Sequence, residues 1–444
     1  MRISVIGTGY VGLVTAVCLA EKGHDVTVVD IDAAKVERVN EGISPFFEPG
    51  LDELLHRHAG QKLRATTNLS MAILESEATF IAVGTPFDGK TIDLTFVKKA
   101  SEDIGWALRK KSEYHVVVVK STVVPGSTDD VVSPALEAGS GKKARKDFGV
   151  GMNPEFLTEG EAISDFMQPD RIVIGGNDPR TLETLKGLYS VFPAVPLVIT
   201  NCKTAEMIKY ASNTLLATLI SFSNEIANLG AALGGIDAAE VMEGLHLSRY
   251  LLPLAPDGTP VRPSIVSFLM PGCGFGGSCL PKDVKALMAH GQEMGESMRL
   301  LQAVLDINAG QHGRMLALLK KHFPSLTELP VTVLGLAFRP DTDDMRESPS
   351  IPIIKMLIRE GAKVTVFDPA AMHEGRKYFG NSVTYGSSLE KSLENSAAVL
   401  LVTRWEAFAV LPDLLAKMPA PPLLVDGRRF ISRTSVAQYE GIGL

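Results

Sequence analysis

Short apolar runs alternate with segments of helical period in the first third of the chain. The runs cover residues 3–6, 26–30, 79–83 and 115–120. Continuous apolar runs of this length, separated by helical segments, are typical of parallel strands that are buried on both faces. The pattern predicts an α/β fold with helices on both faces of a parallel sheet.

The periodicity changes at Thr204, where a helical pattern begins that contains no proline and no glycine before Gly230. We expect one long helix as far as Leu233, acting as a spine between two domains, because a helix of that length needs neighbours along it. The Pro- and Gly-rich segment 249–277 predicts a loop. Helical periodicity returns at about residue 281, is interrupted near residues 291 and 295, and continues to about residue 322.

Strand patterns reappear after Pro330, in residues 331–338, 362–369, 397–403 and 422–427. The two ends of the chain resemble each other, since GHDVTVVDID around Asp30 matches GAKVTVFDP around Asp368. We therefore predict two Rossmann-like doubly wound domains joined by a central helical domain with a long spine helix. The expected boundaries are 1–200, 201–322 and 323–444.

Composition narrows the class of protein. The 444 residues are 45% hydrophobic and 21% charged, which is globular composition and too long for one core. A net charge of −7 without basic clusters argues against nucleic acid as a partner. Four cysteines do not make a disulfide framework, so we expect a soluble protein of the reducing cytoplasm, with no apolar stretch long enough to span a membrane.

Gly7, Gly9 and Gly12 form G-x-G-x-x-G directly after a predicted strand and at the head of a helix. Backbone can approach a pyrophosphate there, and the helix N-terminus supplies positive potential. Asp30 ends the next strand, where a carboxylate accepts hydrogen bonds from a ribose 2′-hydroxyl and repels a 2′-phosphate. This favours NAD over NADP, the alternative being ordinary turn glycines. Gly84, Thr85 and Pro86 follow another strand of the same half and are further candidates.

The segment PGCGFGGSCLPKD, residues 271–283, places four glycines around Cys279 just before a predicted helix start at Pro281. A thiol beside a helix N-terminus and Lys282 favours the reactive thiolate. The alternative is a buried structural cysteine. We predict no metal site, because no second pair of Cys or His residues lies near Cys273 and Cys279.

Acid–base candidates lie elsewhere in the chain. Glu155 and Glu159 stand in NPEFLTEG, and Lys209 and Asn213 are one helical turn apart in EMIKYASN. Apolar neighbours predict partial burial of Lys209, whereas a lysine on a long helix is more commonly solvated. Asp283 is a further carboxylate candidate.

Taken together, the motifs resemble the UDP-glucose/GDP-mannose dehydrogenase family over essentially the whole chain. They are GTGYVG, KSTVVPGST, NPEFLTEGEAISDFMQPDRIVIG, EMIKYASN, GFGGSCLPKD and LAFRPDTDDMRESPS. The resemblance implies a four-electron oxidation of a nucleotide sugar with two NAD molecules, through a cysteine thiohemiacetal and thioester. UDP-glucose is the favoured substrate, and GDP-mannose or another UDP-sugar is the alternative. A regulator without turnover is disfavoured because Cys279, Lys209 and the glycine loop are intact.

The resemblance also implies roles for single residues. Cys279 is the nucleophile, Lys209 steadies oxyanions, Asp283 with Thr122 holds a proton-relaying water, Glu155 is the acid/base and Asn213 orients the sugar. Further implied cofactor contacts are Tyr10, Val11, Lys35, Ser121, Thr122, Glu159, Lys282 and Arg346. Further implied substrate contacts are Phe156, Leu157, Arg262, Phe268, Phe275, Gly276, Phe338 and Arg339.

Two positions and one segment near the implied substrate site depart from the family pattern, the segment being residues 251–270, which is longer than in many relatives. Arg339 replaces a usual lysine, and Met270 stands where some relatives carry a lysine. Arg262 is assigned as the arginine that relatives lend across a homodimer interface, with Arg249 as a competitor. These departures affect the choice of sugar and leave the implied reaction class intact.

Overall fold

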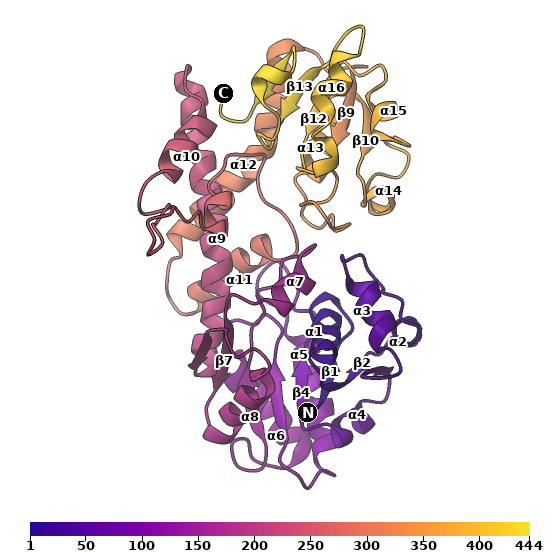
Figure 1. The fold of residues 1–444 in the computed structure, drawn as a ribbon, viewed down its shortest axis with the longest axis vertical. Helices are drawn as coiled ribbons and strands as arrows, with labels where there is room; N and C mark the ends of the chain where they lie inside the picture. The colour runs from indigo at the N-terminus through magenta and orange to yellow at the C-terminus, as the bar shows by residue number, and fades with distance from the viewer. The chain divides into compact units, whose positions relative to one another are not determined.

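The computed structural model describes residues 1–444, which form two compact units, Met1–Ser212 and Asn213–Leu444 (Figure 1). Each unit contains one β-sheet covered by helices. No helix combines the length and the hydropathy that crossing a membrane requires.

The first unit has an eight-stranded sheet in the order β3-β2-β1-β4-β5-β6-β7-β8. Its strands are β1 (Arg2–Ile6), β2 (Asp25–Val29), β3 (Leu63–Thr66), β4 (Ala78–Ile81), β5 (Val116–Val119), β6 (Gly149–Met152), β7 (Ile172–Gly176) and β8 (Leu197–Thr200). The order from β3 to β6 is the doubly wound arrangement predicted from the sequence. Neighbouring strands are parallel except β6 and β7, an antiparallel step that the sequence pattern did not predict.

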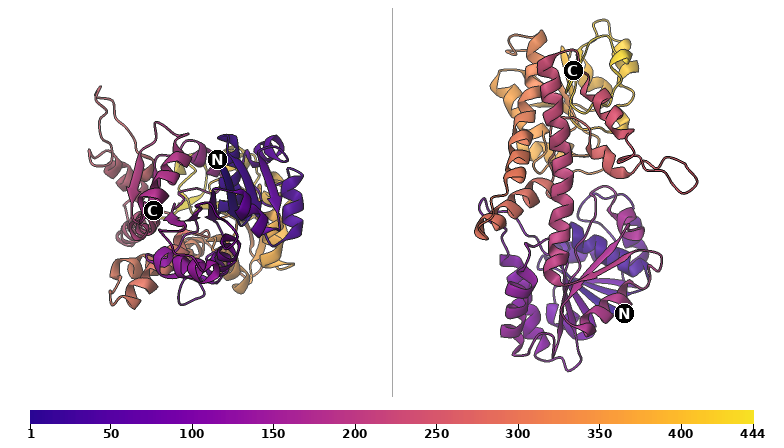
Figure 2. Two further views of the ribbon diagram at one scale, coloured as in Figure 1. Left: turned by 90° about the horizontal axis from the view of Figure 1, so that it is seen from below. Right: turned by 90° about the vertical axis from the view of Figure 1, so that its left-hand side faces the viewer.

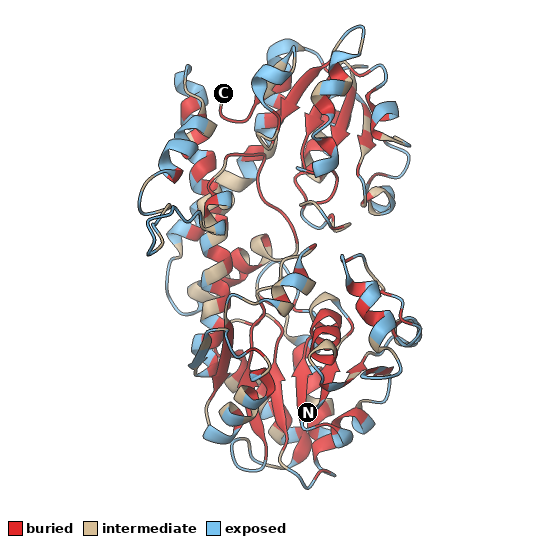
Figure 3. Cartoon of the chain, in the orientation of Figure 1, coloured by how far each residue is buried: buried red, intermediate tan, exposed pale blue.

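Helices cover both faces of this sheet. They are α1 (Tyr10–Glu21), α2 (Ala33–Asn40), α3 (Leu51–His58), α4 (Leu69–Glu75), α5 (Thr95–Leu108), α6 (Ser133–Ser140), α7 (Ala162–Met167) and α8 (Pro179–Tyr189), with a π-helical turn η1 (Thr128–Val132) before α6. In β5, Val116 and Val118 join one hydrophobic cluster while Val117 and Val119 join the other. The strand is therefore buried on both faces, which explains its uninterrupted valine run. Figure 3 colours the central strands of this sheet as buried.

The second unit has a six-stranded parallel sheet in the order β11-β10-β9-β12-β13-β14. Its strands are β9 (Pro330–Leu334), β10 (Lys363–Phe367), β11 (Thr384–Tyr385), β12 (Ala398–Leu401), β13 (Leu423–Asp426) and β14 (Tyr439–Gly441). The sheet is accompanied by α13 (Ser350–Arg359), α14 (Met372–Phe379), α15 (Leu389–Leu393) and α16 (Leu411–Ala416), with single 3-10 turns η3 (Glu406–Phe408) and η4 (Arg433–Ser435). The second Rossmann-like sheet is thereby confirmed.

The predicted spine is confirmed as α9 (Cys202–Leu233), a helix of 32 residues that continues through the boundary between the units (Figure 2). It is followed by α10 (Ala238–His246), the 3-10 turn η2 (Ser264–Phe268), α11 (Leu280–Glu293) and α12 (Arg299–His322). The loop predicted over residues 249–277 contains only η2 and one isolated bridge. Of the two glycines at which an interruption was expected, Gly295 lies in the break between α11 and α12, whereas Gly291 lies inside α11.

A carboxylate takes the same place in both sheets. Asp30 follows β2 and accepts a hydrogen bond from the backbone N–H of Thr8, at 2.8 Å, in the turn after β1. Asp368 follows β10 and accepts from the N–H groups of Leu336 and Ala337, at 2.7 and 3.1 Å, in the turn after β9. The sequence resemblance between the chain ends therefore reflects a repeated structural element.

Candidate active site

Each glycine of the G-x-G-x-x-G turn is needed for a different reason. Gly7 has a φ of +105°, and a Cβ there would lie 2.7 Å from the carbonyl oxygen of Ala82. A Cβ on Gly12 would lie 2.0 Å from the carbonyl oxygen of Gly7, so only glycine lets α1 start this close to β1. A Cβ on Gly9 would meet nothing within 4 Å, which leaves open space where a pyrophosphate can approach the backbone.

Asp30 is held as an ionised acceptor beside this turn. Burial alone would raise its pKa, but hydrogen bonds from the hydroxyl and N–H of Thr8 and from the N–H of Asp32 bring the pKa below its ordinary value. The following residue, Ile31, is 99% exposed and supplies no cation for a 2′-phosphate. The turn and Asp30 therefore fit NAD.

The loops after β4 and β5 are tied to each other next to the turn. The Thr85 hydroxyl donates to the carbonyl oxygen of Thr122 at 2.7 Å, and the Ser121 hydroxyl donates to the carbonyl oxygen of Val83 at 2.7 Å. Gly84 and Pro86 belong to the first of these loops. The structure thus brings together the candidates that sequence reasoning placed after separate strands, at the carboxyl edge where ligands bind in doubly wound sheets.

Glu48 was not predicted, yet it organises the start of α1. Its carboxylate accepts hydrogen bonds from the Tyr10 hydroxyl and from the N–H groups of Gly160 and Ala162, the latter two at 2.8 and 2.7 Å. Burial and the Glu48 carboxylate raise the pKa of Tyr10. This cluster fixes the segment carrying Glu159 against the first residue of α1. The only signal in the sequence was an acidic residue in an otherwise apolar turn.

Glu206 performs a similar task for the loop after β5. It is fully buried and accepts hydrogen bonds from the N–H of Gly126 (2.6 Å), the N–H of Thr128 (2.8 Å) and the hydroxyl of Thr128 (2.6 Å). Burial raises the pKa of Glu206 to about 7. The loop that carries Thr122 is thereby fastened to the first turns of α9.

Glu155 and Lys209 form a buried ion pair. Lys209 Nζ lies 2.9 Å from Glu155 Oε1, and the two side chains are 4% and 6% exposed. Burial would raise the pKa of Glu155, but the Lys209 ammonium and the N–H of Leu157 lower it below its ordinary value. Lys209 Nζ also lies 5.6 Å from the centroid of the Phe156 ring. Lys209 is therefore buried, as its apolar neighbours predicted, and Glu155 is a carboxylate.

In the second unit Cys279 immediately precedes α11, whose first turn contains Pro281 and Asp283. Cys279 is partly exposed, whereas Cys18, Cys202 and Cys273 are buried. Burial raises the pKa of the Cys18 thiol to about 12 and also raises the pKa values of Cys202 and Cys273. The three other cysteines are thus unsuited to nucleophilic chemistry, while Cys279 stands at the positive end of a helix.

Asp283 is almost fully buried and accepts two hydrogen bonds. Asn213 Nδ2 donates to one oxygen at 2.6 Å, and Lys282 Nζ donates to the other at 2.5 Å. The structure therefore joins two predicted catalytic residues, Asp283 and Asn213, and pairs Lys282 with the carboxylate beside it. Asn213 is one turn beyond Lys209 along α9.

The glycine loop before Cys279 packs against the turns after β9. A Cβ on Gly276 would lie 2.2 Å from the carbonyl oxygen of Glu347. Gly277 has a φ of +86°, and a Cβ there would lie 2.7 Å from the Phe338 ring. The Asn308 side chain holds the backbone of Phe275. The N–H of Phe275 donates to Asn308 Oδ1 at 2.8 Å, and Asn308 Nδ2 donates to the carbonyl oxygen of Phe275 at 3.1 Å. The candidates Phe275, Gly276 and Phe338 are therefore neighbours.

The remaining candidates lie near other groups of their units. Arg346 pairs with Asp344 at 2.7 Å, and its carbonyl oxygen accepts from the N–H of Gly277 at 2.9 Å. Arg262 contacts His246 Nδ1 at 3.2 Å. Other placements are Phe268 at the end of η2, Arg339 after Phe338, Lys35 in α2 and Val11 in α1.

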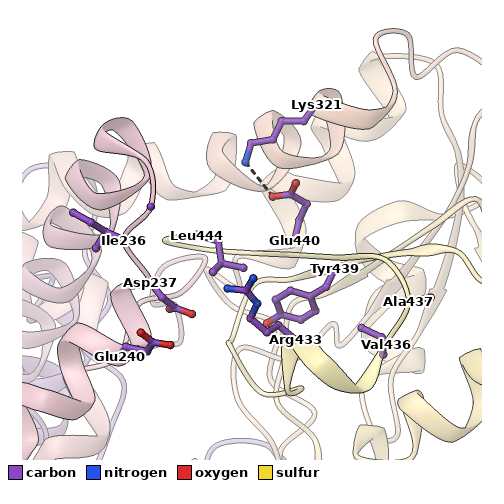
Figure 4. Close-up of a pocket in the computed structure, with 11 residues that line it drawn as sticks. Ile236, Asp237, Glu240, Lys321, Arg433, Val436, Ala437, Tyr439, Glu440 and Leu444 are labelled. Carbon is purple, nitrogen blue, oxygen red and sulfur yellow. Dashed lines mark hydrogen bonds and ion pairs between the residues drawn. The ribbon is translucent and has the colours of Figure 1, made fainter.

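A polar pocket beside the C-terminus is separate from these residues (Figure 4). Its lining includes Asp237, Glu240 and Leu444, together with Lys321 and Glu440, which form an ion pair at 3.0 Å. None of the candidate residues lines this pocket.

Profiles of known families match the chain in three consecutive segments. The NAD binding domain of the UDP-glucose/GDP-mannose dehydrogenase family matches residues 1–193, the central domain 203–310 and the UDP binding domain 332–433. The chain belongs to this family. It is an NAD-dependent oxidoreductase, and NAD is its cofactor.

Individual relatives match along the full length. UDP-glucose 6-dehydrogenase AglM of Haloferax volcanii is 43% identical, with all of both chains covered. GDP-mannose 6-dehydrogenase of Pseudomonas aeruginosa is 39% identical, again with all of both chains covered. The solved structure of a UDP-glucose dehydrogenase from Pyrobaculum islandicum is 37% identical with a TM-score of 0.89, covering 99% of this chain and 97% of that one. Relatives named for UDP-glucose and relatives named for GDP-mannose are therefore both similar to this chain over its full length.

Proposed function

We propose that this protein oxidises UDP-glucose to UDP-glucuronate in two successive NAD-dependent steps. The observation that carries the proposal is Cys279, a partly exposed thiol in a glycine-rich turn at a helix N-terminus. A dehydrogenase that stops at the aldehyde needs no nucleophile, whereas oxidation to the acid does. The full-length relative at 43% identity supports UDP-glucose, and the relative at 39% makes GDP-mannose the second candidate.

In the first oxidation the primary alcohol loses a proton and a hydride and becomes an aldehyde. NAD, when bound at the glycine turn, supplies the hydride acceptor. Asp283 and Thr122 hold the water that takes the proton, a role that suits a buried carboxylate with both oxygens already oriented. Asn213 orients the sugar.

In the second oxidation the Cys279 thiolate adds to the aldehyde carbon and forms a thiohemiacetal. Loss of a second hydride from that carbon gives a thioester. Lys209 balances the negative charge on the oxygen of these intermediates, because a preorganised buried ammonium stabilises charge that develops beside it.

Water then attacks the thioester carbon, the C–S bond breaks, and the carboxylate and the Cys279 thiolate are released. Glu155 takes the proton of the attacking water. Its lowered pKa keeps it ionised for this task. Per sugar, one alcohol and one water are consumed, four electrons leave, and two NADH are formed.

We also propose a homodimer in which α9 packs against its copy. Leu215, Phe222 and Leu229 are 44–58% exposed and follow one another at seven-residue intervals, so they share one face of the helix. In such a dimer Arg262 serves the sugar of the neighbouring subunit. In this proposal residues 1–200 bind the cofactor, residues 201–322 form the dimer interface, and residues 323–444 bind the UDP-sugar. A molar mass of one chain, measured by light scattering at the concentration of the activity assay, would contradict the dimer.

The substrate is tested by comparing kcat/KM for UDP-glucose, UDP-N-acetylglucosamine, UDP-galactose and GDP-mannose with NAD. We expect UDP-glucose to be preferred, with two NADH formed per sugar and no free aldehyde. A preference for GDP-mannose would correct the sugar and leave the reaction class unchanged.

The covalent route is tested with Cys279→Ala, and Cys18→Ala serves as the matched control because Cys18 is a buried core thiol. The Cys279 variant should lose acid formation while aldehyde formation persists slowly. The control should keep two NADH per sugar. Glucuronate production by Cys279→Ala at near wild-type rate would show that the thiol is structural.

A further inference from the structure

Lys120 is a buried lysine to which the reaction described above gives no role. It follows β5 and is 4% exposed. Its ammonium donates to Asn153 Oδ1 at 2.8 Å and lies 3.5 Å from the carbonyl oxygen of Asn153, and it lies 5.9 Å from the centroid of the Phe166 ring. Burying an ammonium costs free energy unless the ammonium is paired with an anion and hydrogen-bonded, and both acceptors of Lys120 are neutral oxygens.

Asn153 connects Lys120 to the segment that carries Glu155. It follows β6, and its backbone N–H donates to the carbonyl oxygen of Val119 at 2.9 Å. Its side-chain amide donates to the carbonyl oxygen of Val173 at 2.8 Å, and its Oδ1 also accepts from the Tyr189 hydroxyl at 2.5 Å. Asn153 is therefore held from β5, β7 and α8 at once. Glu155 comes two residues later, paired with Lys209.

Three buried charged groups belong to this part of the fold. They are the Glu155 carboxylate and the ammonium groups of Lys209 and Lys120. Charge interactions link Lys120 to both Glu155 and Lys209. In the proposed reaction an oxyanion forms beside Lys209, which must then serve two anions. A second buried ammonium supplies a further positive charge at that moment.

We propose that Lys120 is a positioning residue that keeps Glu155 ionised and balances the charge of the oxyanion intermediates through the Asn153–Glu155 segment. The inference rests on the proposed role of Glu155 in thioester hydrolysis. The proposal gives a function to a buried lysine whose hydrogen bonds to Asn153 do not neutralise its charge.

The protonation states agree with this assignment. Burial lowers the pKa of Lys120 to about 8, with Glu155 opposing and Lys209 adding to the shift. Lys120 is one of the cations that bring the pKa of Glu155 below its ordinary value. The other group facing Asn153 is the Tyr189 phenol, whose pKa burial raises, so it stays neutral. Lys120 is therefore charged at neutral pH and loses its charge near pH 8.

Lys111 provides a matched control. It is also a buried lysine, 6% exposed, and its ammonium donates to the carbonyl oxygens of Ile73, Leu74 and Ser76 at 2.6–2.9 Å. These oxygens lie at the end of α4, so the role of Lys111 is to cap a helix. Lys111 precedes β5 and Lys120 follows it, so the two lysines lie at opposite edges of the sheet.

The experiment follows the sugar adduct on Cys279 by acid quench and intact-protein mass spectrometry during turnover of UDP-glucose with NAD, from pH 3.5 to pH 9, so that the series includes the range in which Glu155 titrates. In Lys120→Met the acid limb of adduct hydrolysis should move up by about one pH unit, as expected for loss of a nearby cation. At pH 7 Glu155 is ionised with or without Lys120, so hydrolysis there should slow about tenfold only because the oxyanion intermediate loses a balancing positive charge. Lys120→Gln, which keeps a donor for Asn153 without the charge, should give the same shift.

Lys111→Met should lower Tm and leave the acid limb in place. An unshifted acid limb in both Lys120 variants, with Lys111→Met behaving as expected, would overturn the inference. Glu155→Gln separates this failure from failure of the proposed function. If Glu155→Gln abolishes hydrolysis but the Lys120 variants do not shift the limb, only the inference is wrong. If Glu155→Gln hydrolyses the adduct normally, both are wrong.

Discussion

Replacing Gly276 with alanine should disable the enzyme by moving the loop that carries Cys279. The new Cβ would lie 2.2 Å from the carbonyl oxygen of Glu347 and 2.8 Å from its carbonyl carbon. A carbon–oxygen contact needs roughly 3.3 Å, so the two backbones must separate by about 1 Å. Neither atom belongs to a side chain that can rotate away, and Cys279, the proposed nucleophile, is three residues further along the loop.

A displacement of about 1 Å at a reacting group costs on the order of 100-fold in rate. We therefore expect kcat/KM for NADH formation to fall about 100-fold in Gly276→Ala, with a stability loss of about 1–3 kcal/mol. The matched control is Gly313→Ala, because Gly313 is exposed in α12 and a Cβ there would meet nothing within 4 Å. That change should leave kcat/KM unchanged and stabilise the helix by about 1 kcal/mol.

The values of kcat/KM for Gly276→Ala, Gly313→Ala and wild type come from initial rates. Thermal unfolding of the same proteins is measured in parallel. A Gly276→Ala enzyme with kcat/KM within about threefold of wild type would show that the loop can absorb the displacement, and the reasoning from the close approach would be refuted.

Three further predictions concern the cofactor and the buried charges. Wild-type protein should prefer NAD to NADP by at least about 100-fold in kcat/KM, and Asp30→Ala should reduce this ratio; equal use of both cofactors by wild type would contradict it. The folded-state pKa of Glu206, about 7, exceeds its ordinary value, so its stability contribution is complete below about pH 4.5 and is lost as the pH rises through 7. Glu206→Gln should therefore remove up to about 3 kcal/mol of the decline in unfolding free energy between pH 4.5 and 7, measured by urea titration at several pH values. Asp237→Ala should lower the free energy of unfolding, measured by chemical denaturation, by roughly 3–5 kcal/mol. The reason is that Asp237 pairs with Arg429 at 2.7 Å and both side chains are at most 10% exposed. A loss below about 1 kcal/mol would show that Arg429 finds another partner.

The sequence predicted the elements whose physical cause is local. The valine run of β5 and the uninterrupted helical period of α9 both form as expected. The antiparallel entry of β7 was not predictable, because it depends on where the chain returns to the sheet. Gly151 and Gly176, paired across that step, are ordinary glycines in the sequence.

The same distinction applies to the site. Glycine spacing and the strand-end carboxylate identified the cofactor turn, because those residues are close in sequence. Glu48, Lys120 and Glu206 were missed because their partners lie between 33 and 114 residues away and are mostly backbone groups or amides. When the partner of a buried charge is a backbone N–H far away in the sequence, no residue type at a fixed spacing marks the interaction. The sequence therefore cannot predict it.

The corresponding carboxylates Asp30 and Asp368 separate what orders a turn from what lets it bind a dinucleotide. Each caps the turn after the first strand of its sheet, but only the turn near Asp30 has the three glycines that admit a pyrophosphate. Asp368 is also bonded by the Trp405 indole N–H at 3.2 Å and is buried. The carboxylate therefore orders the turn in both sheets, and the glycines of the turn near Asp30 admit a dinucleotide. An aspartate at this position is by itself evidence for the turn and not for the cofactor.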